Sequence, residues 1–374
     1  MEGETLIRTI GFTVALSLLS GCSVVDAAAT YSNPVIDEVG PADPHVIFYE
    51  GLYYLYCTGD NWSYHVYTSP DLVNWEKGER VFAPGKDKVW APCVFLHKAD
   101  SMFYLYYSVQ WDLGVAVADS PDGTFEDRGK LVDGAIDADM FEDADGNLYL
   151  YYAKDANVIW VQPMADPVTK EGEPTQLLSK AGGWEKKRTE GPCVVKHNGL
   201  YYMLYSAHNA GNPAYAVGYA TADSPTGPFE KYENNPIASR SDTIFGPGHG
   251  MVIQDRAGEY WHVYHQKQAD SVGFDRFICI DPMWFDESGI LHTRTTRGAP
   301  YPAPVTNLPS TTQPRVDIAR KISQRPHYRS RFTLAGQALP GAGAATRSPT
   351  AIAPAIIVGT DGKRTLVGRN AFRD

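Results

Sequence analysis

Basic side chains are scarce in this sequence. Its 374 residues include 33 Lys and Arg against 44 Asp and Glu, which gives a net charge of −11. After position 300, eleven Lys and Arg face only three Asp, so the preceding part of the chain carries −19. Proteins bind nucleic acid through clustered basic residues, and the first 300 residues show no such cluster. The charge therefore argues against nucleic acid as a partner and favours an uncharged one.

The apolar stretch near the N-terminus is too short to cross a membrane. TIGFTVALSLL (Thr9–Leu19) has eleven residues, whereas a spanning helix needs about 20. Its length suits the hydrophobic region of a signal peptide, and it ends in Leu-Ser-Gly-Cys, which resembles a bacterial lipobox. We expect residues 1–22 to be a lipoprotein-type signal peptide whose Cys22 carries the lipid anchor, placing the protein at the outer membrane, in the periplasm or at the cell surface. An ordinary secretory leader is the alternative.

Cysteine is also rare. Besides Cys22 the chain contains Cys57, Cys93, Cys193 and Cys279, all inside apolar runs. An even number of cysteines in an exported protein is compatible with disulfides. Cysteines inside strands of a large core, however, usually act as small buried hydrophobic residues. We expect free thiols.

Tyrosine, glycine and proline are abundant, with 23, 34 and 26 residues, and this favours many short strands and turns. Five segments repeat one pattern of apolar strand, Gly- or Asp-containing turn and aromatic strand, which is typical of hairpins. They begin at Asp43, Ala91, Asp137, Glu190 and His249. Equivalent aromatic residues follow at spacings of 50, 45, 53 and 59. Ser-Pro turns after several aromatic strands indicate a third and fourth strand in each repeat.

The repeats predict an all-β fold, a five-bladed β-propeller of four-stranded antiparallel blades. We expect it to occupy residues 33–299. Residues 300–374 form a linker-like basic C-terminal extension to which we assign no role. The outer strands of the third repeat are the least regular, because that repeat reads PMADP where others have a Ser-Pro turn.

In a propeller the first strand of every blade lines the central channel, so equivalent positions face one another. Three of the five equivalent positions carry acids: Asp43, Asp137 and Glu190; the fifth carries His249. Clustered carboxylates repel one another and are costly to desolvate. Each alone could be a turn residue or a rim charge, but their joint occurrence at one ring position predicts an active site.

At these residues the sequence resembles glycoside hydrolase family 43. The resemblance covers about residues 33–298 and is carried by Ala-Asp-Pro at 42–44, Ile-Asp at 136–137, Glu-Gly-Pro at 190–192 and Gly-His-Gly at 248–250. It implies a five-bladed propeller that hydrolyses arabinose- or xylose-containing plant glycans with inversion. It also implies that Asp43 is the general base, Glu190 the general acid and Asp137 the residue that modulates the pKa of the acid. Asp139, on the same strand face, is a weaker alternative to Asp137.

Further residues are candidates for binding. The resemblance implies that Arg276 is an active-site arginine and that His249 could lie beside a structural calcium ion, with no cofactor required for the chemistry. Trp90 and Phe245 could stack on a sugar or pack in the core. We assign no special role to the other histidines.

We therefore expect an exported glycosidase acting on oligosaccharides or polysaccharides, most simply an α-L-arabinofuranosidase or β-xylosidase. The alternative is a non-catalytic surface propeller that binds glycans. A protein-interaction propeller is disfavoured, because the Gly-His and Trp-Asp signature of WD repeats is absent.

Overall fold

The structure is a computed structural model that describes residues 29–155, 157–306, 356–358 and 364–366. The expected signal peptide, Cys22 and most of the C-terminal extension lie outside these residues. Within the described part, no helix has the length and apolar character needed to cross a membrane. The chain divides into two units, Met1–Thr311 and Thr312–Asp374. In the second unit, β24 (Ile356–Val358) pairs with β25 (Arg364–Leu366).

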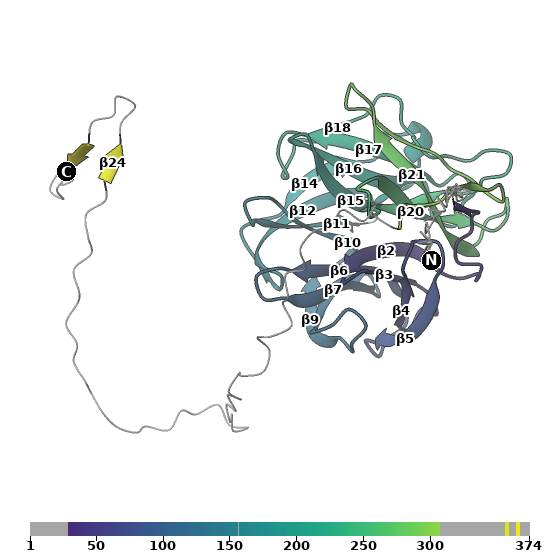
Figure 1. Ribbon diagram of the computed structural model, residues 1–374, viewed down its shortest axis with the longest axis horizontal. Helices are drawn as coiled ribbons and strands as arrows, with labels where there is room; N and C mark the ends of the chain where they lie inside the picture. The colour runs from purple at the N-terminus through teal and green to yellow at the C-terminus, as the bar shows by residue number, and fades with distance from the viewer. Residues whose placement is uncertain (1–28, 156, 307–355, 359–363, 367–374) are drawn as a thin grey trace, which may run out of the picture. The chain divides into compact units, whose positions relative to one another are not determined.

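The first unit is a five-bladed β-propeller of antiparallel sheets, as predicted (Figure 1). Blade 1 contains β2 (Ala42–Tyr49), β3 (Leu52–Thr58), β4 (Tyr64–Ser69) and β5 (Glu76–Phe82). Blade 2 contains β6 (Val89–His97), β7 (Met102–Val109), β8 (Asp112–Ala118) and β9 (Glu126–Val132). Blade 3 contains β10 (Ala135–Glu142), β11 (Leu148–Lys154), β12 (Val158–Asp166), β13 (Thr169–Lys170) and β14 (Thr175–Ser179). Blade 4 contains β15 (Thr189–His197), β16 (Leu200–Ala207), β17 (Ala216–Ala222) and β18 (Glu230–Lys231). Blade 5 contains β19 (Gly248–Gln254), β20 (Tyr260–Lys267), β21 (Arg276–Phe285) and β22 (Leu291–Thr293).

Blade 3 departs from the others, because both β13 and β14 pair with β12. The two ends of the propeller are joined by a short strand pair, β1 (Thr30–Tyr31) with β23 (Tyr301–Pro302). The segment after β1 then runs beside β21, where Val35 and Gly40 donate backbone hydrogen bonds to Ile278 and Arg276. These contacts fix the first blade against the fifth.

Tyrosines on the second strands connect consecutive blades. The hydroxyls of Tyr56, Tyr106 and Tyr151 donate to proline carbonyls in the turn of the next blade, at distances of 2.5, 2.7 and 2.7 Å. Each ring is buried, so the ring contributes apolar burial and its hydroxyl is satisfied. The repeated prolines in the sequence are thus acceptors between blades as well as turn residues.

Every first strand contains a bulge at the same place. Strand pairing shifts register after Ala42, Trp90, Ile136, Glu190 and Gly248. The next residue in each blade has a positive φ: Asp43 51°, Ala91 42°, Asp137 60°, Gly191 59° and His249 46°. A bulge re-aims side chains and is often found beside active sites.

This register corrects the predicted ring position of Glu190. The residue of blade 4 that is equivalent to Asp43 is Gly191, and Glu190 occupies the preceding position, with Trp90 and Ile136 as its counterparts. The sequence already contains this register. When Ala-Asp-Pro, Trp-Ala-Pro and Glu-Gly-Pro are aligned on their prolines, Glu190 falls one residue before the position of Asp43. The acids therefore come from two successive positions of the bulge.

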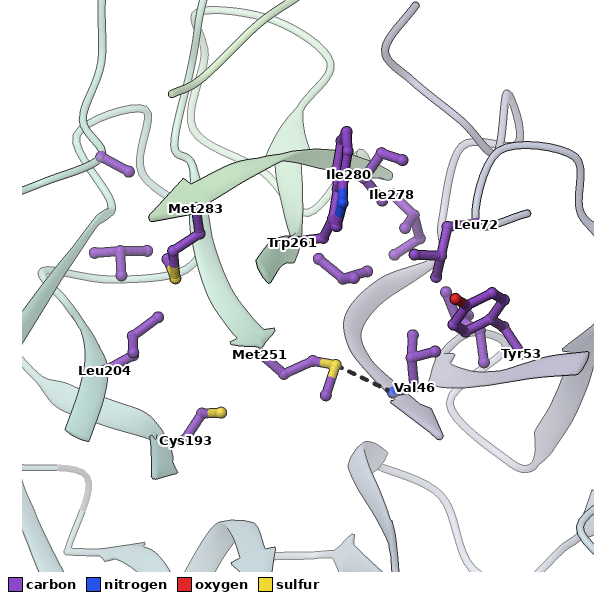
Figure 2. Packing of buried hydrophobic residues seen from close by; sticks show 14 of the residues in the cluster. Val46, Tyr53, Leu72, Cys193, Leu204, Met251, Trp261, Ile278, Ile280 and Met283 are labelled. Atoms are coloured by element: carbon purple, nitrogen blue, oxygen red, sulfur yellow. Dashed lines mark hydrogen bonds between the residues drawn. The ribbon is translucent and has the colours of Figure 1, made fainter. Parts of the chain in front are cut away.

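A second ring of side chains lies two residues further along each first strand. Three members accept a hydrogen bond from a backbone N–H of the following blade: His45 from Val94, Asp139 from Val194 and Met251 from Val46. The thiols of Cys93 and Cys193 lie beside the backbone of Met140 and Val252. Figure 2 shows the last contact, from the Val46 amide to the Met251 sulfur. The described cysteines are buried and unpaired, as predicted, and two of them belong to this ring.

Candidate active site

The candidate active site is a cavity of about 460 Å³ at one end of the propeller axis. That volume is in the range of small-molecule sites. Six residues singled out from the sequence line it: Asp43, Trp90, Asp137, Glu190, His249 and Arg276. The structure thus brings together residues that are as far apart as 233 positions in the chain.

Asp43 is the most extensively held of the acids. Its Oδ1 accepts a hydrogen bond from Arg276 Nη1 at 2.8 Å and lies 3.1 Å from His265 Nδ1. Its Oδ2 accepts from the Thr58 hydroxyl at 2.7 Å, and this hydroxyl in turn accepts from the Ala91 amide at 2.8 Å. These contacts fix the position of the carboxylate in the bulge.

The same neighbours keep Asp43 ionised. Burial opposes its charge, but the Arg276 guanidinium holds the pKa of Asp43 well below its usual range, and the neighbouring rings of His249 and His265 act in the same direction. A charged neighbour within hydrogen-bonding distance favours the ionised carboxylate. Asp43 can therefore accept a proton.

The charge of Asp137 is coupled to the charges of both Asp43 and Glu190. Its Oδ2 accepts from the Gly191 amide at 3.1 Å, and its own amide donates to Ser108 Oγ at 3.1 Å. Burial, followed by the charge of Asp43, raises the pKa of Asp137 to about 7. The charge of Asp137 in turn affects Glu190.

Glu190 has the character of a proton donor. It is 4% exposed; its Oε1 accepts from the Tyr215 hydroxyl at 3.0 Å, and its Oε2 lies 3.6 Å from Arg188 Nη1. Burial and then the charge of Asp137 raise the pKa of Glu190 to about 7, although Arg188 works in the opposite direction. One cavity thus contains an ionised carboxylate and a carboxyl group poised to be protonated.

His249 lies between the first two acids, with its Nδ1 3.5 Å from Asp43 Oδ1 and 3.8 Å from Asp137 Oδ2. Burial lowers the pKa of His249, so the neutral imidazole is favoured. Calcium takes six to eight oxygen ligands, and these two carboxylates supply only part of such a set. An ion here would depend on water for its remaining ligands.

A different group of described residues has closer metal-ligand spacing. The ligand atoms of His45, Cys93 and Asp139 lie within 4.8 Å of one another in the second ring. Burial raises the pKa of Asp139 to about 7. Asp139 does not line the cavity, so its position favours Asp137 over Asp139 as the modulating residue.

The structure also shows residues that sequence reasoning missed. His265 was given no role, yet its ring contacts Asp43 and is fully buried. Trp111, Arg188 and Phe274 also line the cavity. All three lie in loops between strands, where the repeat pattern does not predict which way a side chain points. Of these three residues, only Arg188 lies close in the sequence to a predicted site residue, two positions before Glu190.

Phe245 does not line this cavity. Its ring lies 5.6 Å from the guanidinium of Arg297, and its carbonyl accepts from the Lys267 amide. The expectation that Phe245 contacts a sugar therefore has no support from its position. Phe274, in the loop before β21, is the aromatic residue of blade 5 that borders the cavity.

Comparison with known proteins identifies the family. The family model described as glycosyl hydrolases family 43 matches residues 31–291. The chain belongs to this family. It is therefore a glycosidase.

Relatives within family 43 resemble the chain over most of its length. It is 30% identical to the β-D-galactofuranosidase xynD of Aspergillus niger, over 76% of this chain and 92% of that protein. It is 29% identical to an arabinoxylan arabinofuranohydrolase of Bacillus subtilis, over 69% of this chain and 63% of that protein. The crystal structure of a thermostable family-43 glycoside hydrolase superposes with a TM-score of 0.69 at 35% identity, covering 74% of this chain and all of that one.

Proposed function

We propose that the protein is an exported hydrolase that removes arabinose or xylose from plant oligosaccharides or polysaccharides with inversion of configuration. The observation that supports this proposal best is the opposite protonation preference of two carboxyl groups in one cavity. The pKa of Asp43 is held low by Arg276, and that of Glu190 is raised to about 7. Glycoside hydrolysis needs this combination of base and acid.

In the proposed reaction Asp43 takes a proton from a water molecule as the water oxygen attacks the anomeric carbon. Glu190 donates its proton to the glycosidic oxygen as the bond from that oxygen to the anomeric carbon breaks. The products are the free sugar and the shortened glycan, and the proton on Asp43 returns to Glu190 through solvent. Arg276, His265 and Thr58 orient the base throughout.

Inversion is the stereochemistry that membership of family 43 suggests. Inverting enzymes separate the two carboxyl groups by about 6.5 to 9.5 Å, whereas retaining enzymes bring them within about 5.5 Å. Asp137 perturbs Glu190 and is itself perturbed by Asp43.

The names of the relatives indicate which sugars to test as substrates. The two relatives described above are named for galactofuranose and for arabinofuranose on arabinoxylan, and a further relative is named a β-xylosidase. A screen of aryl α-L-arabinofuranoside, β-D-xyloside and β-D-galactofuranoside, followed by NMR of the first-formed anomer, tests substrate and stereochemistry together. Release of the retained anomer would overturn the assigned mechanism.

The variants Glu190→Gln and Asp43→Asn test the roles of the acids. Each is expected to lower kcat/KM on a natural oligosaccharide by at least about a thousandfold while glycan binding persists, because each removes a proton-transfer group. A non-catalytic glycan-binding propeller would bind without turnover in the parent as well. Parent-level turnover by either variant would refute its role.

Export and calcium remain parts of the proposal that rest on the sequence. The Leu19–Cys22 lipobox-like segment supports export and a lipid anchor on Cys22. A calcium ion beside His249 would be structural, and prolonged dialysis against EDTA is expected to leave kcat unchanged. Metabolic labelling with a fatty acid, with and without Cys22→Ala, tests the anchor.

A further inference from the structure

Trp111 is held in a strained turn above the candidate active site. Val109 pairs with Asp112, so Gln110 and Trp111 form the two-residue loop between β7 and β8, with φ of 52° and 71°. Turns with two positive φ values strongly prefer Asn-Gly, and bulky residues in this region are outliers. Strain of this kind gathers at functional sites.

The side chain of Trp111 borders the cavity and is 39% exposed. Its ring meets that of Trp90 edge to face, with centroids 5.5 Å apart. Trp90 is itself fixed, because its Nε1 donates to Asn61 Oδ1 at 2.9 Å. The two rings form an aromatic wall contributed by blade 2.

Arg188 links this wall to Glu190. Its guanidinium carbon lies 5.3 Å from the centre of the Trp111 ring, and its Nη1 lies 3.6 Å from Glu190 Oε2. The second distance permits charge attraction but is too long for a hydrogen bond. Among the described residues none accepts a hydrogen bond from this guanidinium, so its donors are available to a ligand.

The position of Glu190 decides which part of a glycan reaches this wall. The general acid protonates the oxygen of the leaving group, so the surface beside Glu190 faces that group. Resting on the function proposed above, we propose that Trp111 and Arg188 form a subsite for the sugar on the leaving-group side. The sugar packs its C–H face on Trp111, and its hydroxyl oxygens accept hydrogen bonds from Arg188.

The variant Trp111→Gly separates binding from folding. Glycine suits a positive φ, so the urea midpoint is expected to stay equal or rise, whereas a residue needed for the fold would lower it. Loss of the stacking surface is expected to reduce kcat/KM on an oligosaccharide by at least about tenfold, the equivalent of one good contact. Gln110→Gly is the matched control, because Gln110 is the other residue of the turn, has a φ of 52° and does not line the cavity.

The glycosyl fluoride of the same sugar is the comparison substrate. Fluoride leaves without a sugar in the subsite and without a proton from Glu190, so Trp111→Gly is expected to hydrolyse it at the parent rate. An equal loss on fluoride and oligosaccharide would overturn the subsite, as would no loss on either. A parent enzyme that cleaves neither substrate would instead refute the proposed function.

Arg188→Met tests the second half of the subsite. Its positive charge favours ionised Glu190, so its removal is expected to move the alkaline limb of kcat/KM on the oligosaccharide to higher pH and to raise KM. Arg188→Lys should restore the limb in part, and Lys187→Met, which removes the neighbouring exposed charge, should leave it unchanged. A parent-level KM for the oligosaccharide in Arg188→Met would overturn the subsite, and an unmoved alkaline limb would contradict the coupling of Arg188 to Glu190.

Discussion

Gly191 offers a sharp test of the geometry at the propeller axis. It follows the proposed acid, has a φ of +59°, and donates its amide to Asp137 Oδ2. A β-carbon at this position would lie 3.1 Å from His249 Nδ1 and 3.2 Å from His249 Cγ. In Gly191→Ala the imidazole must therefore shift by a few tenths of an ångström.

The expected loss has two parts. A left-handed backbone costs an alanine about 1 kcal/mol of stability relative to glycine. The displaced His249 ring then disturbs the spacing around Asp43 and Asp137, 3.5 and 3.8 Å away. Catalytic groups tolerate displacements of about 0.5 Å, and about 1 Å can cost a hundredfold, so we expect kcat/KM to fall roughly threefold to tenfold.

Gly199→Ala is the matched control. Gly199 lies in the turn between β15 and β16 of the same blade, with a φ of +87° and no atom within 4 Å of an added β-carbon. Urea denaturation should show a loss of about 1 kcal/mol in both variants, and steady-state kinetics a loss of kcat/KM in Gly191→Ala alone. Parent-level activity in Gly191→Ala, or an equal loss in Gly199→Ala, would refute the reasoning.

Three further outcomes are expected around the acids. Asp137→Asn removes the charge that raises the pKa of Glu190, so the alkaline limb of kcat/KM should move to lower pH; an unmoved limb would contradict this coupling. Arg276→Met removes the guanidinium that lowers the pKa of Asp43, so the acidic limb of kcat/KM should move to higher pH. A pH–rate profile like that of the parent would disprove the role of this ion pair. Thr58→Val leaves a buried amide and the Asp43 carboxylate without a hydroxyl partner, costing about 1 to 3 kcal/mol in urea denaturation, whereas Thr58→Ser should restore most of that stability.

The repeats made the fold predictable. Aromatic strands recurring at about 50 residues, each with its own hairpin turn, leave few arrangements that bury every sheet. The Asp43 and Asp137 positions followed from the same alignment, because each precedes an apolar run that must be a first strand. The acid of Glu-Gly-Pro stands one position before the acid of Ala-Asp-Pro, so matching the acids instead of the prolines places Glu190 one position too late.

The loop residues could not be predicted in the same way. Trp111, Arg188 and Phe274 reach the cavity from connections between strands, where no periodicity fixes the direction of a side chain. His265 contacts Asp43 from a second strand, and only the packing of blade 5 against blade 1 shows that contact.

The sequence by itself determined the fold, the number of blades and the family, because these depend on patterns that repeat along the chain. The tertiary structure alone decided which groups surround each acid and hence how readily each takes a proton. A pKa depends on burial and on charges a few ångströms away, and those neighbours come from blades that are distant in the sequence.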